Sequence, residues 1–79
     1  METENRKIPI LDIYQAAFLV HNEIEPVLCK QGSRVVFEFP GTELVFELLD
    51  EYNRNPSIRL LDFVGRLRRL RAQMLSMRG

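Results

Sequence analysis

Arg34-Val35-Val36-Phe37-Glu38-Phe39, followed by Pro40-Gly41, is the stretch that decides the fold. Val35, Phe37 and Phe39 alternate along it with Arg34, Val36 and Glu38. Such period-two alternation of β-branched and aromatic residues predicts a β-strand with one buried face. The segments on either side show helical spacing and need an apolar sheet face to pack on. We therefore expect the domain to be organised around this strand.

Two further strands and a helix are expected before it. The segment Arg6–Ile10 is expected to be a short strand, which Pro9 requires to be brief or to lie at an edge. Leu11–Asn22 is a helix with Asp12 as its N-cap and Asn22 as a left-handed residue that ends it. Glu23–Lys30 is the second strand, at an edge or beginning only after its proline. A loop at residues 31–33 joins it to the third strand, and the predicted antiparallel order is second, third, first.

Two helices are expected after the central strand. Thr42 is a natural N-cap for a helix that runs to about Asn53. After a turn, Ser57 is expected to cap the longest helix, which runs to about Met77. Gly65 inside that helix marks a close helix crossing or is merely tolerated. The fold class is therefore α+β, in the order β-α-β-β-α-α, with a small antiparallel sheet and helices packed on one of its faces.

Length and composition indicate one small domain. The 79 residues should form a single domain over residues 1–79, with residues 1–5 disordered. No apolar run approaches the roughly 20 residues of a membrane span, and the polar start of the chain does not resemble a secretory signal. Cys29 is the only cysteine and cannot form an internal disulfide, which suits a reducing compartment. We expect a cytoplasmic protein with no membrane partner.

Charge is unevenly distributed along the chain. Residues 1–55 carry ten acids and five bases, a net charge of −5, whereas residues 56–79 carry six arginines and one acid, a net charge of +5. A basic tail on an acidic body can bind nucleic acid, or the two segments can neutralise each other within the fold. The second interpretation has the arginines facing the acidic helix that precedes them. For the first, the candidate phosphate contacts lie on one flank of the last helix: Arg59, Arg66 and Arg69.

The end of the last helix favours a different function. Met74, Leu75 and Met77 continue its apolar stripe almost to the C-terminus, beyond the core that so small a domain should offer. Exposed apolar stripes are typical of self-association, and methionine adapts to such contacts. These three residues are the candidate self-association site. Phe46, at the edge of the preceding helix's apolar face, is a further contact candidate if it stays exposed.

The usual catalytic residues are missing from the sequence. It has one histidine and one cysteine, no glycine-rich phosphate loop and no cluster with metal-ligand spacing. We therefore expect no enzyme activity, no catalytic or metal-binding residues and no cofactor.

Three motifs resemble a family of small bacterial domains of unknown function. They are the helix Asp12–Leu19, the strand Val35–Phe39 and the Leu67–Arg71 segment of the last helix. The family shows Asp-x-Tyr-x-Ala-Ala-x-Leu, Val-Phe-x-Phe and Leu-Arg-x-Leu-Lys in that order. The chain departs from it at Asn22, where a glycine is common, near Asn53, where a tryptophan is common, and at Arg71 in place of lysine. The resemblance implies the same β-α-β-β-α-α layout and no established activity.

The sequence thus favours a non-catalytic bacterial interaction domain that self-associates, as a homodimer, or binds another protein through its C-terminal helix. A nucleic-acid-binding accessory domain that uses the arginines of that helix is the alternative.

Overall fold

The structure, a computed structural model, describes residues 6–78. The prediction that residues 1–5 are disordered lies outside these residues. The elements follow the predicted order: β1 (Lys7–Ile10), α1 (Ile13–His21), β2 (Val27–Gln31), β3 (Arg34–Pro40), α2 (Glu43–Asn53) and α3 (Leu60–Arg78). The α+β layout β-α-β-β-α-α is confirmed, with a three-stranded antiparallel sheet and three helices.

The sheet is built around β3, as predicted. Its strand order is β1-β3-β2, and Phe37 of β3 lies opposite Ile10 on one side and Leu28 on the other. β2 begins only after Pro26 and runs through residue 31, so the hairpin loop is the two-residue Gly32-Ser33, shorter than expected. Gly32 has a φ of 63°, and a positive φ at only the first loop residue is typical of a type II′ turn.

The predicted inner face of β3 is confirmed. Val35, Phe37 and Phe39 are all buried, and the two phenylalanines are completely so. Val36 differs from the expected alternation because only 2% of it is exposed, although it lies on the opposite face. It lies in the central strand, directly across from Cys29 of β2.

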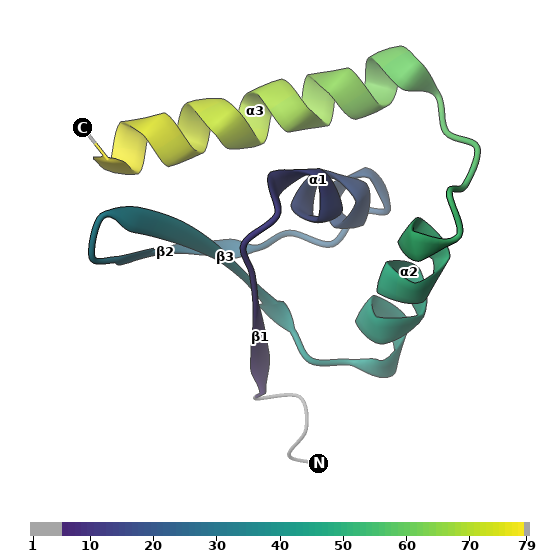
Figure 1. Ribbon diagram of the computed structural model, residues 1–79, viewed down its shortest axis with the longest axis horizontal. Helices are drawn as coiled ribbons and strands as arrows, with labels where there is room; N and C mark the ends of the chain where they lie inside the picture. The colour runs from purple at the N-terminus through teal and green to yellow at the C-terminus, as the bar shows by residue number, and fades with distance from the viewer. Residues whose placement is uncertain (1–5, 79) are drawn as a thin grey trace.

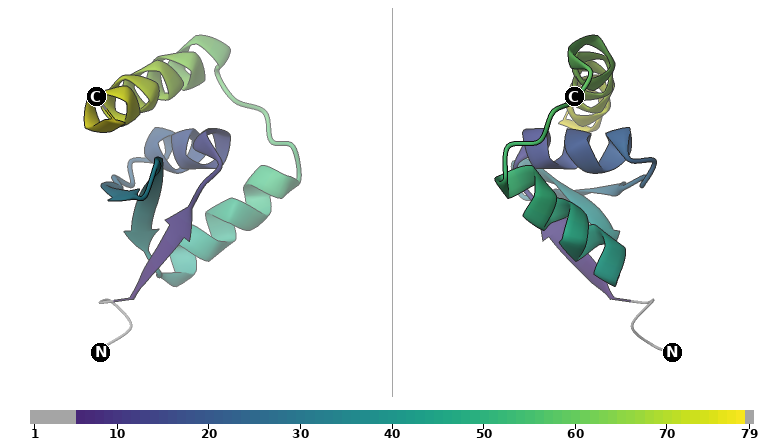
Figure 2. Two further views of the ribbon diagram at one scale, coloured as in Figure 1. Left: turned by 60° about the vertical axis from the view of Figure 1, so that its left-hand side comes forward. Right: turned by 90° about the vertical axis from the view of Figure 1, so that its right-hand side faces the viewer.

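The helices lie to one side of the sheet (Figures 1 and 2). α1 lies between the sheet and α3, and its Ala16 and Ala17 are completely buried, which allows close packing. α2 closes the side of the core with Val45 and Leu48. α3 crosses α1 on the side away from the sheet and buries only Leu70 completely.

The end of α1 departs from prediction by one residue. Asn22 has a φ of −93°, and the left-handed residue is Glu23, with a φ of 67°. The N–H of Glu23 donates to the Val20 carbonyl at 2.8 Å, and the N–H of Ile24 donates to the Leu19 carbonyl at 3.1 Å. These two hydrogen bonds form a Schellman motif with glutamate at the position where glycine is favoured.

One of the two predicted caps after the sheet is confirmed. The Thr42 hydroxyl accepts a hydrogen bond from the Val45 N–H at 3.3 Å, as expected of an N-cap. The Ser57 cap is wrong, because α3 begins at Leu60 and the Arg59 carbonyl accepts its first helical hydrogen bond, from the Phe63 N–H. Residues 55–59 instead form a non-helical linker that carries the chain from the end of α2 to a helix lying across α1 (Figure 1).

Candidate interaction surface

The core-facing side of α3 is one apolar stripe. Its members recur at intervals of four and three residues and are all at least partly buried: Phe63, Leu67, Leu70, Met74 and Met77. All but Met77 belong to the hydrophobic core or pack against it. A stripe of this spacing covers one side of a helix and leaves the opposite side without a partner in the same chain.

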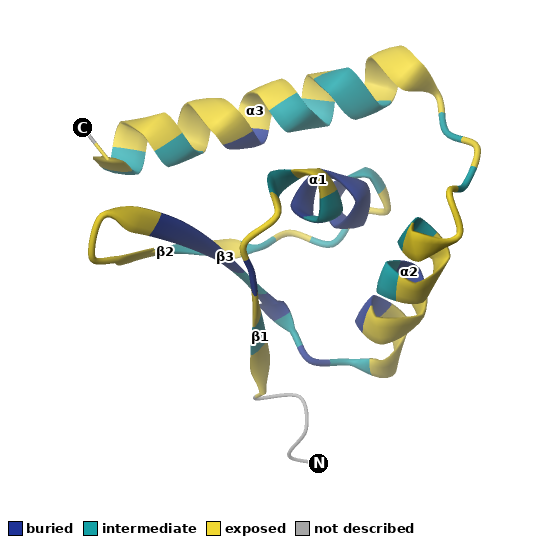
Figure 3. Cartoon of the chain, viewed as in Figure 1, coloured by how far each residue is buried: buried dark blue, intermediate teal, exposed yellow. Residues whose placement is uncertain are grey.

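The opposite side of α3 carries a second series, which we call the outer seam. It has the same four–three spacing, and all its members are exposed: Leu61, Gly65, Arg68, Ala72 and Leu75. Leu61 is 81% exposed and Leu75 is 55% exposed. Figure 3 shows this exposed side running along the length of α3. Apolar residues at both ends and small residues between them are what a second helix could pack against.

Gly65 is the one residue of the outer seam without a side chain. A Cβ added there would meet no atom within 4 Å, so the fold itself does not need a glycine at this position. Glycine inside a helix nevertheless costs about 0.8–1.0 kcal/mol relative to alanine. Of the two interpretations made from the sequence, a close crossing by another helix of this chain is excluded among residues 6–78. Two explanations of the glycine remain: a helix from outside the chain crosses close to it, or the fold simply tolerates it.

The predicted self-association residues do not share one surface. Met74 packs against the core and Met77 is partly buried on the same side. Leu75 points outward as part of the outer seam. The domain therefore offers more core to the end of α3 than the sequence suggested, and Leu75 is the most accessible of the three.

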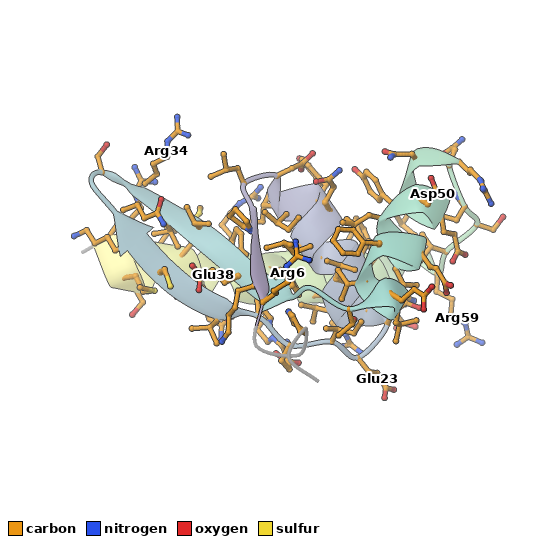
Figure 4. All side chains as sticks on the ribbon, turned by 90° about the horizontal axis from the view of Figure 1, so that it is seen from below. Arg6, Glu23, Arg34, Glu38, Asp50 and Arg59 are labelled. Atoms are coloured by element: carbon orange, nitrogen blue, oxygen red, sulfur yellow. The ribbon has the colours of Figure 1, made fainter. Side chains whose placement is uncertain are left out.

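The three predicted phosphate-binding arginines differ in their surroundings. Arg59 precedes α3 and projects from the molecule at the end opposite Arg34 (Figure 4). Arg66 is partly buried. Arg69 donates to both carboxylate oxygens of Glu25, at 3.1 and 3.2 Å, so its guanidinium is already paired.

The expectation that the arginines of α3 face the preceding acidic helix is wrong. α3 packs on α1, and it scarcely touches α2. Apart from the Arg69–Glu25 pair, the ion pair found within residues 6–78 joins Arg54 to Asp50, one turn apart at the end of α2. The physical reason is the linker, which separates α2 and α3 instead of folding one back on the other (Figure 1).

An open groove of about 400 Å³ lies where α1, α2 and the linker meet. Half of its lining residues are aromatic, and three are amide or proline residues from the end of α2 and the linker: Tyr14, Phe18, Tyr52, Asn53, Asn55, Pro56, Ile58 and Phe63. The rings of Phe18 and Tyr52 are 5.7 Å apart and tilted, as in favourable aromatic pairs. Burial, with the nearby charges of Asp12 and Tyr14, raises the pKa of Tyr52. Sequence reasoning missed this groove because its residues come from three separate segments.

The chain's cysteine lies on the sheet face that carries no helix. A hydrogen bond to the Glu38 carboxylate raises the pKa of the Cys29 thiol, and partial burial and the charge of Glu38 act in the same direction. Lys7 opposes the shift. Because a raised pKa favours the protonated thiol, this arrangement suppresses nucleophilic reactivity at neutral pH.

No protein-family model, curated protein or solved structure matches the chain. Within residues 6–78, no three histidine, cysteine or acidic side chains are grouped as a metal site would require. Over the same residues, every helix is too short or too polar to cross a bilayer. The function of the protein must therefore be inferred from its own surfaces.

Proposed function

We propose that this chain is a non-catalytic interaction domain that self-associates through α3. The observation that carries the proposal is the outer seam, which repeats the spacing of the core-facing stripe but has no partner within the described chain. An amphipathic helix in a small domain normally places polar residues on its outward side. Here Leu60 and Leu61, at the start of α3, are 68% and 81% exposed. Exposed leucines and small residues on one side of a helix favour contact with another helix.

Two expectations from the sequence form part of this proposal. The single cysteine, which is protonated and unpaired, suits a cytoplasmic location. The resemblance to small bacterial domains of unknown function implies the layout that the structure has, and we propose a bacterial domain of that kind.

The test is the molar mass of the protein in solution, measured by light scattering from low to high micromolar concentration. We expect the wild-type mass to rise above that of one chain, and we expect Leu61→Asp and Leu75→Asp to keep the protein monomeric without unfolding it. Val27→Ser is the matched control, because it changes an exposed apolar residue on the sheet and should leave association intact. A wild-type protein that stays monomeric at high micromolar concentration would contradict the proposal.

Met74→Ser distinguishes a loss of self-association from a loss of fold stability. Because Met74 packs against the core, its replacement should lower thermal stability, whereas Leu61→Asp should not. If both variants melt at the wild-type temperature, the division of α3 into an inner stripe and an outer seam is wrong.

A further inference from the structure

α2 presents an acidic outward side. The helix has four acids and no base over Glu43–Asn53, so it carries a net charge of −4. The acids are all exposed, and two exposed apolar residues flank them: Leu44, 55% exposed, and Phe46, 48% exposed. This side of α2 therefore combines negative charge with apolar contact area, and the contact suggested from the sequence for Phe46 is accessible.

α3 has the opposite charge. Over Leu60–Arg78 it carries five arginines and one aspartate, a net charge of +4. Arg68 lies in the outer seam, and Arg71 lies one helical turn further along on its flank, where it is also exposed. Asp62, the only acid of the helix, lies toward the other flank, where Arg69 is. The seam therefore combines positive charge with exposed leucines.

These opposite charges are not neutralised within one chain. α2 and α3 scarcely touch, and their exposed sides point to different sides of the molecule (Figure 3). In the described residues, no ion pair joins the two helices. The two surfaces thus carry opposite charges, each has exposed apolar residues, and both are accessible at the same time.

We propose that the outer seam of α3 docks on the outward side of α2 of a second copy, a contact that rests on the proposed self-association. Leu44 and Phe46, which lie two residues apart on α2, pack against the leucine at one end of the seam, and the arginines reach the acids of α2. α2 spans about 16 Å and the seam about 21 Å at 1.5 Å per residue, so α2 can cover most of the seam. The small side chains at Gly65 and Ala72 let the helices approach closely. The contact joins two different surfaces, so it either forms twice in a two-fold dimer or continues head to tail.

Charge reversal tests this contact. Glu47→Lys/Glu51→Lys makes the acidic side basic, and Arg68→Glu/Arg71→Glu makes the basic side acidic. Each variant alone should associate at least about tenfold more weakly than the wild type, because like charges then meet. An equimolar mixture of the two should regain association, since the altered α2 of one variant then faces the altered α3 of the other.

The control has the same net charge as the α3 variant. Lys30→Glu/Arg34→Glu reverses two exposed bases of the β2–β3 hairpin, and it should associate like the wild type. Equal weakening of this control would show that net charge alone acts and would overturn the proposal. Circular dichroism of each protein shows that its helices are intact before the masses are compared.

The outcomes separate this contact from the proposed function. If the wild type is monomeric at every concentration, both the proposed function and this contact fail. If the wild type associates and the α2 variant alone associates equally well, α3 uses another partner surface and only this contact fails. If both variants lose association but their mixture does not regain it, the contact is also overturned. Recovery in the mixture, with an unaffected hairpin control, supports it.

Discussion

Replacing Gly65 by alanine should make the folded chain more stable and its self-association weaker. Gly65 lies inside α3, and a Cβ built there has no neighbour within 4 Å. The substitution therefore adds no clash within the chain and gains the helix propensity of alanine, about 0.8–1.0 kcal/mol in the free energy of unfolding. For a domain of this size, 1 kcal/mol corresponds to a rise of about 4–8 °C in melting temperature.

The two effects are measured separately. Urea unfolding at low micromolar concentration, where a weak contact is dissociated, gives the stability of the single chain. Light scattering at high micromolar concentration gives the association. The added methyl group occupies the space directly above residue 65 in the outer seam. A partner helix that crosses close to Gly65 must therefore move away and lose packing contacts.

Gln73→Ala is the matched control for Gly65→Ala. Gln73 is exposed on α3 outside the outer seam, so its replacement should change stability by no more than a few tenths of a kcal/mol and leave association unchanged. A less stable Gly65→Ala protein would refute the claim that the glycine is free of internal contacts. A more stable protein with undiminished association would refute the claim that a partner helix crosses there.

Three further substitutions test local features of the fold. Glu23→Gly should stabilise the chain by about 0.5–1 kcal/mol, because glycine adopts the left-handed conformation at the end of α1 without strain; an unchanged urea midpoint would contradict the Schellman assignment. Thr42→Ala should cost about 1 kcal/mol through loss of the α2 cap, whereas Ser57→Ala should fall within about 0.5 kcal/mol of the wild type in the same urea series. Glu38→Gln should speed alkylation of Cys29 by iodoacetamide at pH 8, because removing the carboxylate lowers the raised thiol pKa and increases the thiolate fraction. An alkylation rate equal to that of the wild type would show that Glu38 does not hold the thiol proton.

The parts of the fold that are determined by residues close together in the sequence were predictable. The alternation of Val35, Phe37 and Phe39 indicated the buried face of β3, and Thr42 indicated the start of α2. The end of α1 was missed by one residue for a local reason of its own. The Asn22 side chain donates a hydrogen bond to the Phe18 carbonyl at 2.9 Å. This bond holds Asn22 at the helix end, so Glu23 is the residue that adopts the left-handed conformation.

The candidate surface was only partly predictable, because the apolar stripe of α3 is wide in the sequence. Leu60 and Leu75 lie seven and eight residues from Leu67, spacings at which core residues of a helix also recur, and periodicity alone does not say which edge of a wide stripe is buried. That choice depends on where α1 lies against α3. The outer seam is visible only once the helix is placed, since its central members Gly65, Arg68 and Ala72 are not apolar enough to form a pattern.

The net charge of zero concealed the feature on which the proposed contact depends. The opposite charges of the two segments favoured the expectation that the acids of α2 and the arginines of α3 neutralise each other within the fold. The linker at residues 55–59 prevents this, because it is non-helical and includes Asn55 in the left-handed conformation, with a φ of 59°. It directs α3 across α1 and leaves −4 and +4 on two separate helices. A chain that separates complementary surfaces in this way has no low-energy route to pair them internally without unpacking α3 from the core. Their mutual attraction is therefore available only between copies, and it should weaken as salt screens it.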